Sequence, residues 1–302
     1  MIQLDISTEP ELYVDYLKGV EFLKQLNFDN FNYPSEITYF HVYSEIKNEK
    51  ELECVKSYFA TQNLEKTKLV LWSDFDISNQ QNIAPYKDLI DFRVYSPIEE
   101  SKGTIMEGQT ERLLAKDSKH YLQSDLLRIL ALHKYGGIWI DMDVILLRDF
   151  KPILDQEFFY QWGGDTDFSN LGCCGTVMSL KKNSELSTKL LTQLINTPVV
   201  GNTTIWGKDL FAHVYRSSKF TIFPSTFFNI EWLMSKIDKK LSEDILEFWF
   251  ENECPDNLLF TECFAWHWHN SSNKNKQTVD KSKFGKLKKI TEHKLLENGL
   301  GF

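Results

Sequence analysis

The segment from His120 to Phe150 constrains the fold more than any other part of the sequence. Its first half repeats apolar residues at helical spacing, which predicts a helix with one apolar face. Gly136 and Gly137 follow, and glycine readily adopts the positive φ angles that end a helix. A short apolar strand then leads directly into Asp141 and Asp143. This order predicts a buried strand that places two carboxylates at one edge of a sheet.

Asp141 and Asp143 are separated by one residue, so on an extended segment their side chains point to the same side, with Cα atoms about 7 Å apart. Two unpaired carboxylates this close raise each other's pKa. A hard divalent cation with oxygen ligands removes that cost, and it can also neutralise a departing diphosphate. We therefore expect Mn²⁺ or Mg²⁺ at this pair, with Met142 facing the core. For an isolated Asp-x-Asp, a solvated turn is the alternative.

Asp125 and Arg128 are charged residues on the otherwise apolar helix, three positions apart. One interpretation is an ion pair on the helix surface, which contributes a few tenths of a kcal/mol. The other is that both side chains contact a bound ligand near the two aspartates.

The segment before residue 120 predicts a parallel sheet. Strands are expected at 37–43, 68–72 and 91–95, and helices at 9–27 and 48–62. Alternation of strands and helices favours right-handed crossovers in an α/β fold. Ligands of such sheets bind beyond the carboxyl ends of the strands, and no linker or repeat divides the chain. We expect one domain.

Composition excludes some partners. The 302 residues carry a formal net charge of -9, which makes nucleic acid a poor partner. A lysine-rich stretch from Lys274 to Lys294 is either a solvated face or a basic patch for a donor phosphate or an anionic membrane. The five cysteines show no CxxC spacing, the N-terminus lacks signal-peptide features, and no apolar run reaches about 18 residues. These features predict a soluble, cytoplasmic protein, with peripheral membrane contact through the basic stretch as an option.

The central segment resembles the donor-site motif of glycosyltransferase family 32, the sugar transferases that contain a DXD motif. That motif reads S-D-x-x-R-x-x-x-L-x-x-x-G-G-x-Y-x-D-x-D, and it matches from Ser124 to Asp143, with Trp139 in place of the usual Tyr. Weaker, collinear similarity extends over roughly residues 36–272. It includes the sequences around Ile37–Tyr43, Val70–Asp74, Ser169–Asn170, Phe223–Phe228 and Ala265–Ser271.

The resemblance implies a GT-A fold, in which a Rossmann-like, mostly parallel sheet is flanked by helices, with helical additions at the termini. A nucleotide-sugar half would occupy about residues 36–150 and an acceptor half about 151–272, followed by a basic tail over 273–302. Asp143 would bind the metal directly, and Asp141 would do so through water or would bind sugar hydroxyls. The implied contacts to the donor are His41, Tyr43, Ser73, Asp74, Asp125, Arg128, Trp139 and Asp141.

His267 and His269 alternate with two tryptophans, so on a strand both imidazoles share one face. His267 aligns with the family's H-x-W-x-x-S segment and would be a third metal ligand or a diphosphate contact. Imidazole suits Mn²⁺ better than Mg²⁺. A core strand with satisfied histidines is the alternative.

The polar segment 163–170 would reach the sugar or the acceptor, or would form an ordinary turn. Asn170 would be the catalytic-site asparagine that follows the DXD motif in the family. Asp165 and Asp167 would be the general-base candidates if the reaction inverted the anomeric centre.

These features together predict a metal-dependent glycosyltransferase. The resemblance implies a nucleotide-sugar donor, UDP-linked by preference, a glycan or lipid-linked glycan as the acceptor, and retention of configuration. Two alternatives stay open. One is a toxin-type enzyme that glycosylates a protein through the same donor site. The other is a metal-dependent nucleotide hydrolase or nucleotidyltransferase, although the sequence has no GxxxxGK[ST] phosphate loop.

Overall fold

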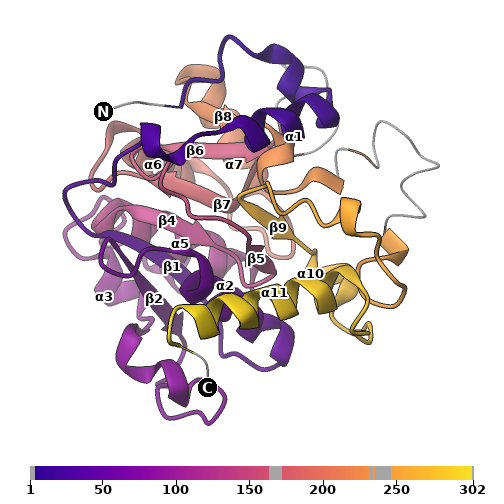
Figure 1. Ribbon diagram of the computed structural model, residues 1–302. Helices are drawn as coiled ribbons and strands as arrows, with labels where there is room; N and C mark the ends of the chain where they lie inside the picture. Colours follow the sequence, from indigo (N-terminus) through magenta and orange to yellow (C-terminus); the bar gives the residue numbers. More distant parts are fainter. Residues whose placement is uncertain (1–3, 163–171, 232–233, 235–245, 301–302) are drawn as a thin grey trace.

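The computed structural model describes residues 4–162, 172–231, 234 and 246–300, and Figure 1 shows how they are arranged. Within these residues the strands are β1 (Thr38–Tyr43), β2 (Thr67–Ser73), β3 (Ile90–Val94), β4 (Gly137–Ile140), β5 (Val144–Leu146), β6 (Phe158–Gln161), β7 (Cys173–Leu180), β8 (Thr221–Phe223) and β9 (Ala265–His267). The α-helices are α1 (Tyr16–Gln25), α2 (Glu49–Thr61), α3 (Pro97–Ser101), α4 (Thr110–Leu113), α5 (Tyr121–Tyr135), α6 (Glu185–Asn196), α7 (Lys208–Ser217), α10 (Asn270–Asn273) and α11 (Lys283–Glu297).

Seven of the described strands form one sheet in the order β3-β2-β1-β4-β7-β6-β8, and β5 pairs with β9 beside it. The first four strands of this order are parallel, as is the β6–β8 pair, whereas β7 runs antiparallel to both β4 and β6. The mostly parallel α/β sheet expected from the sequence is therefore confirmed. Because β1, β2 and β4 are parallel, their carboxyl ends meet at one edge, where Asp141 follows β4.

Each strand sends alternate side chains to two different cores. On one face, Phe40 of β1 and Ile140 of β4 join residues of α2, α11 and the small sheet. On the other, Trp72 of β2 and Trp139 of β4 join residues of α5, α6 and α7. The sheet is thus covered on both faces, which is why its strands are apolar on both sides.

The N-terminal helix is shorter than expected. Instead of one helix over 9–27, a 3₁₀ turn at Pro10–Tyr13 precedes α1. Asp15 has an extended backbone between the two, and its carboxylate accepts a hydrogen bond from the Lys18 N–H at 3.1 Å. Asp15 is thus an N-cap, and the cap residue lies outside the helix that it starts.

Most of the segment expected to be a basic tail forms a helix, α11, that packs against the rest of the domain. Figure 1 shows α11 running alongside α2, and Phe284, Leu287 and Leu295 bury its apolar side. Four of its lysines pair with acidic residues: Lys283–Glu231, Lys286–Asp256, Lys288–Glu49 and Lys289–Asp280. Lys294 donates to the Leu147 carbonyl instead, and Lys281, just before the helix, pairs with Glu253.

None of the described helices combines the length and the apolar character needed to cross a membrane.

Candidate functional site

The Gly136-Gly137 pair determines how closely β4 approaches β1. Both residues have positive φ, 71° and 106°. A Cβ on Gly137 would lie 2.1 Å from the Tyr39 carbonyl oxygen, which no side chain can tolerate. The pair therefore ends α5 and lets β4 pair beside β1 within two residues. Asp141 follows, and its N–H donates to the Thr176 carbonyl at 2.8 Å.

Asp141 and Asp143 lie on a turn rather than on the extended segment that the sequence suggested, since Met142 and Asp143 leave the strand geometry. Their carboxylates consequently have different partners. Asp141 accepts hydrogen bonds from Arg128 Nη2 at 2.9 Å and from the Trp139 indole N–H at 2.7 Å. Burial raises the pKa of Asp141, although Arg128 opposes that rise. Met142 is buried in the core, as expected.

Asp143 pairs with the C-terminal part of the chain. Its Oδ2 lies 3.2 Å from His267 Nε2 and accepts a hydrogen bond from the Asn270 N–H at 2.8 Å. Burial alone would raise the pKa of Asp143, but His267 and the two hydrogen bonds outweigh it and hold that pKa at about 2. β9 brings His267 here because Val144, next to Asp143, pairs with His267 across the small sheet.

The two histidines share a side, but only His267 is on the strand. His267 Nδ1 lies 3.2 Å from the Tyr160 hydroxyl, which fixes the ring. His269 has a left-handed backbone with φ 55°, stacks on His267 with ring centroids 3.8 Å apart, and bonds Asn229 Oδ1 at 3.2 Å. Burial lowers the pKa of His269 to about 2, so it stays neutral. His269 thus supports His267 and does not contact Asp143.

Asp125 and Arg128 are not a surface ion pair. Arg128 Nη2 lies 3.6 Å from Asp125 Oδ1, and both side chains are largely buried. Burial raises the pKa of Asp125 to about 6, against the effect of Arg128. Two glycines leave the necessary space: a Cβ on Gly207 would lie 3.0 Å from Asp125 Oδ2, and one on Gly175 would lie 2.6 Å from Arg128 Nη1.

These groups open into one cleft of about 840 Å³. Most of the expected site residues line it, at the carboxyl edge of the sheet. They are Tyr43, Asp74, Asp125, Arg128, Asp141, Asp143 and His267. Tyr43 donates to Asp74 Oδ1 at 2.5 Å, and this contact joins the ends of β1 and β2.

Three expected donor contacts do not line the cleft. His41 is fully buried, where Nδ1 accepts from the Trp72 indole and Nε2 lies 3.0 Å from the Gly136 carbonyl. Burial lowers the pKa of His41 to about 4. Ser73 donates to the Phe75 carbonyl. Trp139 acts on the site through Asp141, to which its indole N–H donates, and through Arg128, whose guanidinium lies 5.5 Å from the centroid of the Trp139 ring. The sequence located the strand ends correctly but not which side chains face inward.

Asp165, Asp167 and Asn170 lie outside the described residues.

The expected ligand set Asp141, Asp143 and His267 does not assemble as three converging side chains. Across the described ranges, no three His, Cys, Asp or Glu side chains form a cluster able to hold a metal ion, and Asp141 faces Arg128 instead. One oxygen is nevertheless without a partner here: Asn270 Oδ1 is buried and makes no hydrogen bond in the described structure. It belongs to the residue whose N–H binds Asp143. Asp143, His267 and Asn270 thus form a carboxylate–imidazole–amide set suited to a cation such as Mn²⁺.

The sequence did not single out several residues that line the cleft. They are Glu51, Lys119, His120, Tyr121, Trp162, Thr203, Thr204, Lys208 and Asn270. Lys274 also lines the cleft, and it was expected only as part of the lysine-rich stretch. Asn270 could have been found, because it lies three residues after His267 inside the segment that resembles the family. The others lie on separate elements that only the fold brings together.

A family model covers the segment that carries both aspartates. Residues 48–160 match the family model described as "Glycosyltransferase sugar-binding region containing DXD motif", a range that runs from α2 to β6 and includes both aspartates. A comparison with the sequences of curated proteins gave no match.

Solved glycosyltransferases share the fold at low sequence identity. GlyE of Streptococcus pneumoniae TIGR4 superposes with a TM-score of 0.53 at 10% identity, over 89% of this chain and 65% of that chain. The galactosyltransferase LgtC, in complex with donor and acceptor sugar analogues, gives 0.50 at 9% identity over 85% and 96%. The bifunctional WbbM gives 0.50 at 10% identity over 89% and 50%. The chain thus spans about two thirds of the GlyE chain and half of the WbbM chain, and it has the GT-A fold.

Proposed function

We propose that this chain, a glycosyltransferase of the GT-A type, moves a sugar from a UDP-linked donor to a hydroxyl group of a glycan in the presence of Mn²⁺ or Mg²⁺. The observation that carries the proposal is the pairing of Asp143 with His267 and Asn270 at one end of a cleft that Asp125 and Arg128 also line. These side chains offer a cation site and a polar sugar site within one cavity.

Asp143, His267 and the unpartnered Asn270 oxygen would hold the cation. A bound divalent cation would neutralise the negative charge of the departing diphosphate. As a metal ligand, His267 would bind through an unprotonated Nε2, and the Tyr160 hydroxyl, 3.2 Å from Nδ1, could accept a hydrogen bond from Nδ1–H and favour that tautomer.

Arg128 and Asp125 would bind the sugar or the adjacent phosphate. Arg128 Nε is buried without a partner in the described structure, so the guanidinium has a donor to spare. Tyr43 and Asp74, at the ends of β1 and β2, would contact the nucleoside.

Retention of configuration agrees with the state of the carboxylates in the centre of the cleft. Asp125 and Asp141 both pair with Arg128, and Asp143 pairs with His267. Each of these carboxylates already has a cationic or imidazole partner. A paired carboxylate is better suited to binding a ligand than to attacking the sugar as a nucleophile. A front-face reaction, in which the leaving phosphate takes the acceptor proton, needs no protein nucleophile.

The test is a panel of nucleotide-sugars in thermal shift, with and without Mn²⁺. A ligand that binds only the folded state raises the melting temperature. We expect a UDP-sugar to raise it more with Mn²⁺ than without, and the same donor to release UDP when glycan acceptors are added. Equal shifts for all nucleotides with and without metal would contradict the proposal. If UDP were released only when a protein acceptor is added, the proposed donor site would stand, and the acceptor would be a protein and not a glycan.

A further inference from the structure

Lys50, in the first turn of α2, holds three backbone carbonyls of a segment more than 220 residues away. Its ammonium donates to the carbonyls of Asn273 at 2.9 Å, Lys276 at 2.6 Å and Lys274 at 3.4 Å. The same ammonium lies 4.3 Å from the ring centroid of Phe250 and 5.9 Å from that of Trp268. It forms no salt bridge in the part of the chain that the structure describes, although the charge of Glu251 also acts on it, so these carbonyls and rings are its direct contacts.

The segment that Lys50 holds is the one that reaches Asp143. It begins at His267 and continues through Asn270, and the Trp268 N–H also donates to the Asp143 carbonyl at 2.9 Å. Asn273 closes it internally, because its side-chain amide donates to the carbonyls of Trp268 and His269 at 2.8 and 3.2 Å. Lys50 therefore fixes the far end of a short, internally bonded segment whose near end is the proposed cation site.

Glu51, the next residue, holds a different segment that lines the cleft. Its Oε2 accepts hydrogen bonds from the Ser44 hydroxyl and the Lys47 N–H, both at 2.9 Å. The loop so fixed contains Ile46 at φ 48°, which is an uncommon conformation for a β-branched residue and needs support from its surroundings. Ser44, Glu45 and Lys47 line the cleft.

We propose that Lys50 and Glu51 are positioning residues that act on two different ends of the donor site. Lys50 keeps His267 and Asn270 at Asp143, and Glu51 keeps the loop after β1 in place for the nucleoside. This inference rests on the proposed function of the cleft. The physical reason is pre-organisation: a segment that is already ordered loses less conformational entropy when a ligand binds.

The first test is Lys50→Ala, which removes the ammonium and leaves the three carbonyls facing a space of the shape of n-propylammonium. We expect faster amide hydrogen exchange over 267–276 than in the wild type. We also expect a Mn²⁺ concentration for half-maximal binding, with UDP present, about tenfold higher, which corresponds to about 1.4 kcal/mol. Added n-propylammonium should reverse much of both effects. A general loss of packing would not respond to the amine.

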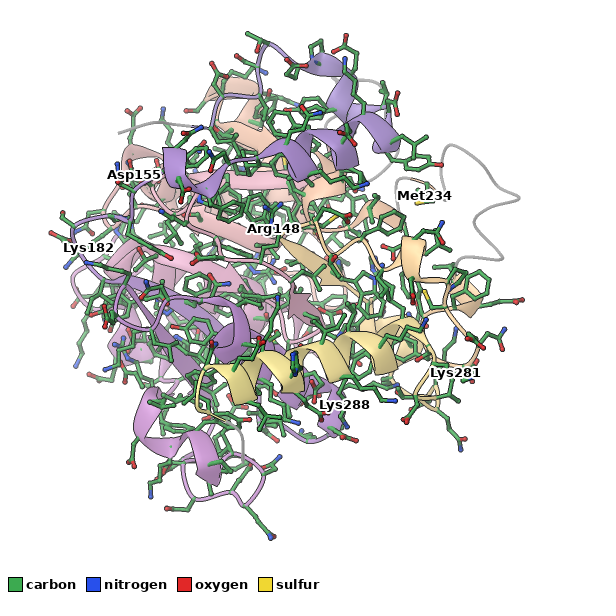
Figure 2. The ribbon with its side chains drawn as sticks, in the orientation of Figure 1. Arg148, Asp155, Lys182, Met234, Lys281 and Lys288 are labelled. Atoms are coloured by element: carbon green, nitrogen blue, oxygen red, sulfur yellow. The ribbon has the colours of Figure 1, made fainter. Side chains whose placement is uncertain are left out.

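The matched control is Lys288→Ala. Lys288, labelled on α11 in Figure 2, pairs with Glu49 in the same first turn of α2 but does not line the cleft. This variant should leave exchange over 267–276 and the Mn²⁺ requirement unchanged. Equal effects of the two substitutions would overturn the assignment of Lys50.

Glu51→Gln should show the opposite pattern to Lys50→Ala. It should weaken UDP binding without metal and leave the Mn²⁺ requirement near that of the wild type. Loss of Mn²⁺ binding in Glu51→Gln, or unchanged exchange in Lys50→Ala, would refute the division of roles. If the wild type binds neither UDP nor Mn²⁺, the proposed function fails, whereas exchange and its rescue by the amine still decide whether Lys50 orders the segment.

Discussion

Arg128 donates to both carboxylate oxygens of Asp141, at 2.9 and 3.3 Å. The same guanidinium lies 3.6 Å from Asp125, so one cation contacts two of the carboxylates that line the cleft. Asp143 has a histidine partner instead. The two aspartates of the motif thus have different partners: Asp141 is held by Arg128, whereas Asp143 is the one that would bind a metal ion in the proposed function.

Asp143→Asn should therefore abolish activity without unfolding the protein. The substitution keeps the volume of the side chain and removes its charge. We expect transfer to fall by about 100-fold or more, because removal of one group that stabilises developing charge has effects of that size. Asp155→Asn, at a half-exposed residue paired only loosely with Lys181, is the control and should retain activity. Full transfer by Asp143→Asn, measured as UDP release, would exclude a metal role for this carboxylate.

Arg128→Met should raise the KM for the donor at least about tenfold. The variant loses the guanidinium and leaves Asp141 without a cationic partner beside Asp143, although the Trp139 N–H remains, so its remaining activity should also depend more steeply on Mn²⁺. Arg93→Met removes a guanidinium that pairs with Asp91 on β3 and serves as the control. If both variants have the donor KM of the wild type, Arg128 does not contact the donor.

Tyr160→Phe tests how His267 is held. The hydroxyl is the partner of His267 Nδ1, and loss of such an outer partner typically weakens metal binding about 10–100-fold. We expect a higher Mn²⁺ requirement with unchanged UDP affinity in the absence of metal. An unchanged Mn²⁺ titration would show that His267 is not a ligand or does not need this support.

Asp125 should make stability depend on pH. Its pKa is about 6 in the folded protein and lower when unfolded, so the folded state binds more protons between these values. Its favourable contribution is full below about pH 4 and is lost as the pH rises through 6. Asp125→Asn should remove this dependence and raise the free energy of unfolding at pH 7 by up to about 3 kcal/mol, while it weakens donor binding. Urea unfolding from pH 4 to 7.5 measures this, and parallel curves for the two proteins would contradict it.

Gly175→Ala should impair the site through crowding. The new Cβ would lie 2.6 Å from Arg128 Nη1 and 2.7 Å from Phe211, and overpacking of this kind typically costs about 1–3 kcal/mol. Gly207→Ala, whose Cβ would lie 3.0 Å from Asp125, should be milder. The order of donor KM values, with Gly175→Ala the higher, checks this, and a reversed order would argue against it.

The sequence predicted what local rules determine. The Gly-Gly pair, the strand after it and the two aspartates lie within eight residues, so spacing alone was enough to predict that the aspartates follow a buried strand at the edge of the sheet. His41 shows the limit. The end of β1 was predicted correctly, but a period of two does not say which face of the sheet is closed, and His41 is enclosed beneath Trp72.

The parts that were not predicted depend on distant partners. Spacing suggested that Asp141 and Asp143 converge, yet Arg128 draws one away and His267 the other, and the second contact joins residues 124 apart. The lysine-rich stretch was expected to be either a solvated face or a basic patch, because the acidic partners of its α11 lysines lie on four other segments. No periodicity in the sequence reports such pairings.

The pairing of β5 with β9 has a consequence for biosynthesis. A nascent chain that has emerged from the ribosome as far as Leu146 contains both aspartates and the helix with Arg128, but it lacks His267 and Asn270, which arrive more than 100 residues later. Until then Asp143 has no imidazole partner. The order of translation thus delays the completed site until most of the polypeptide has been made.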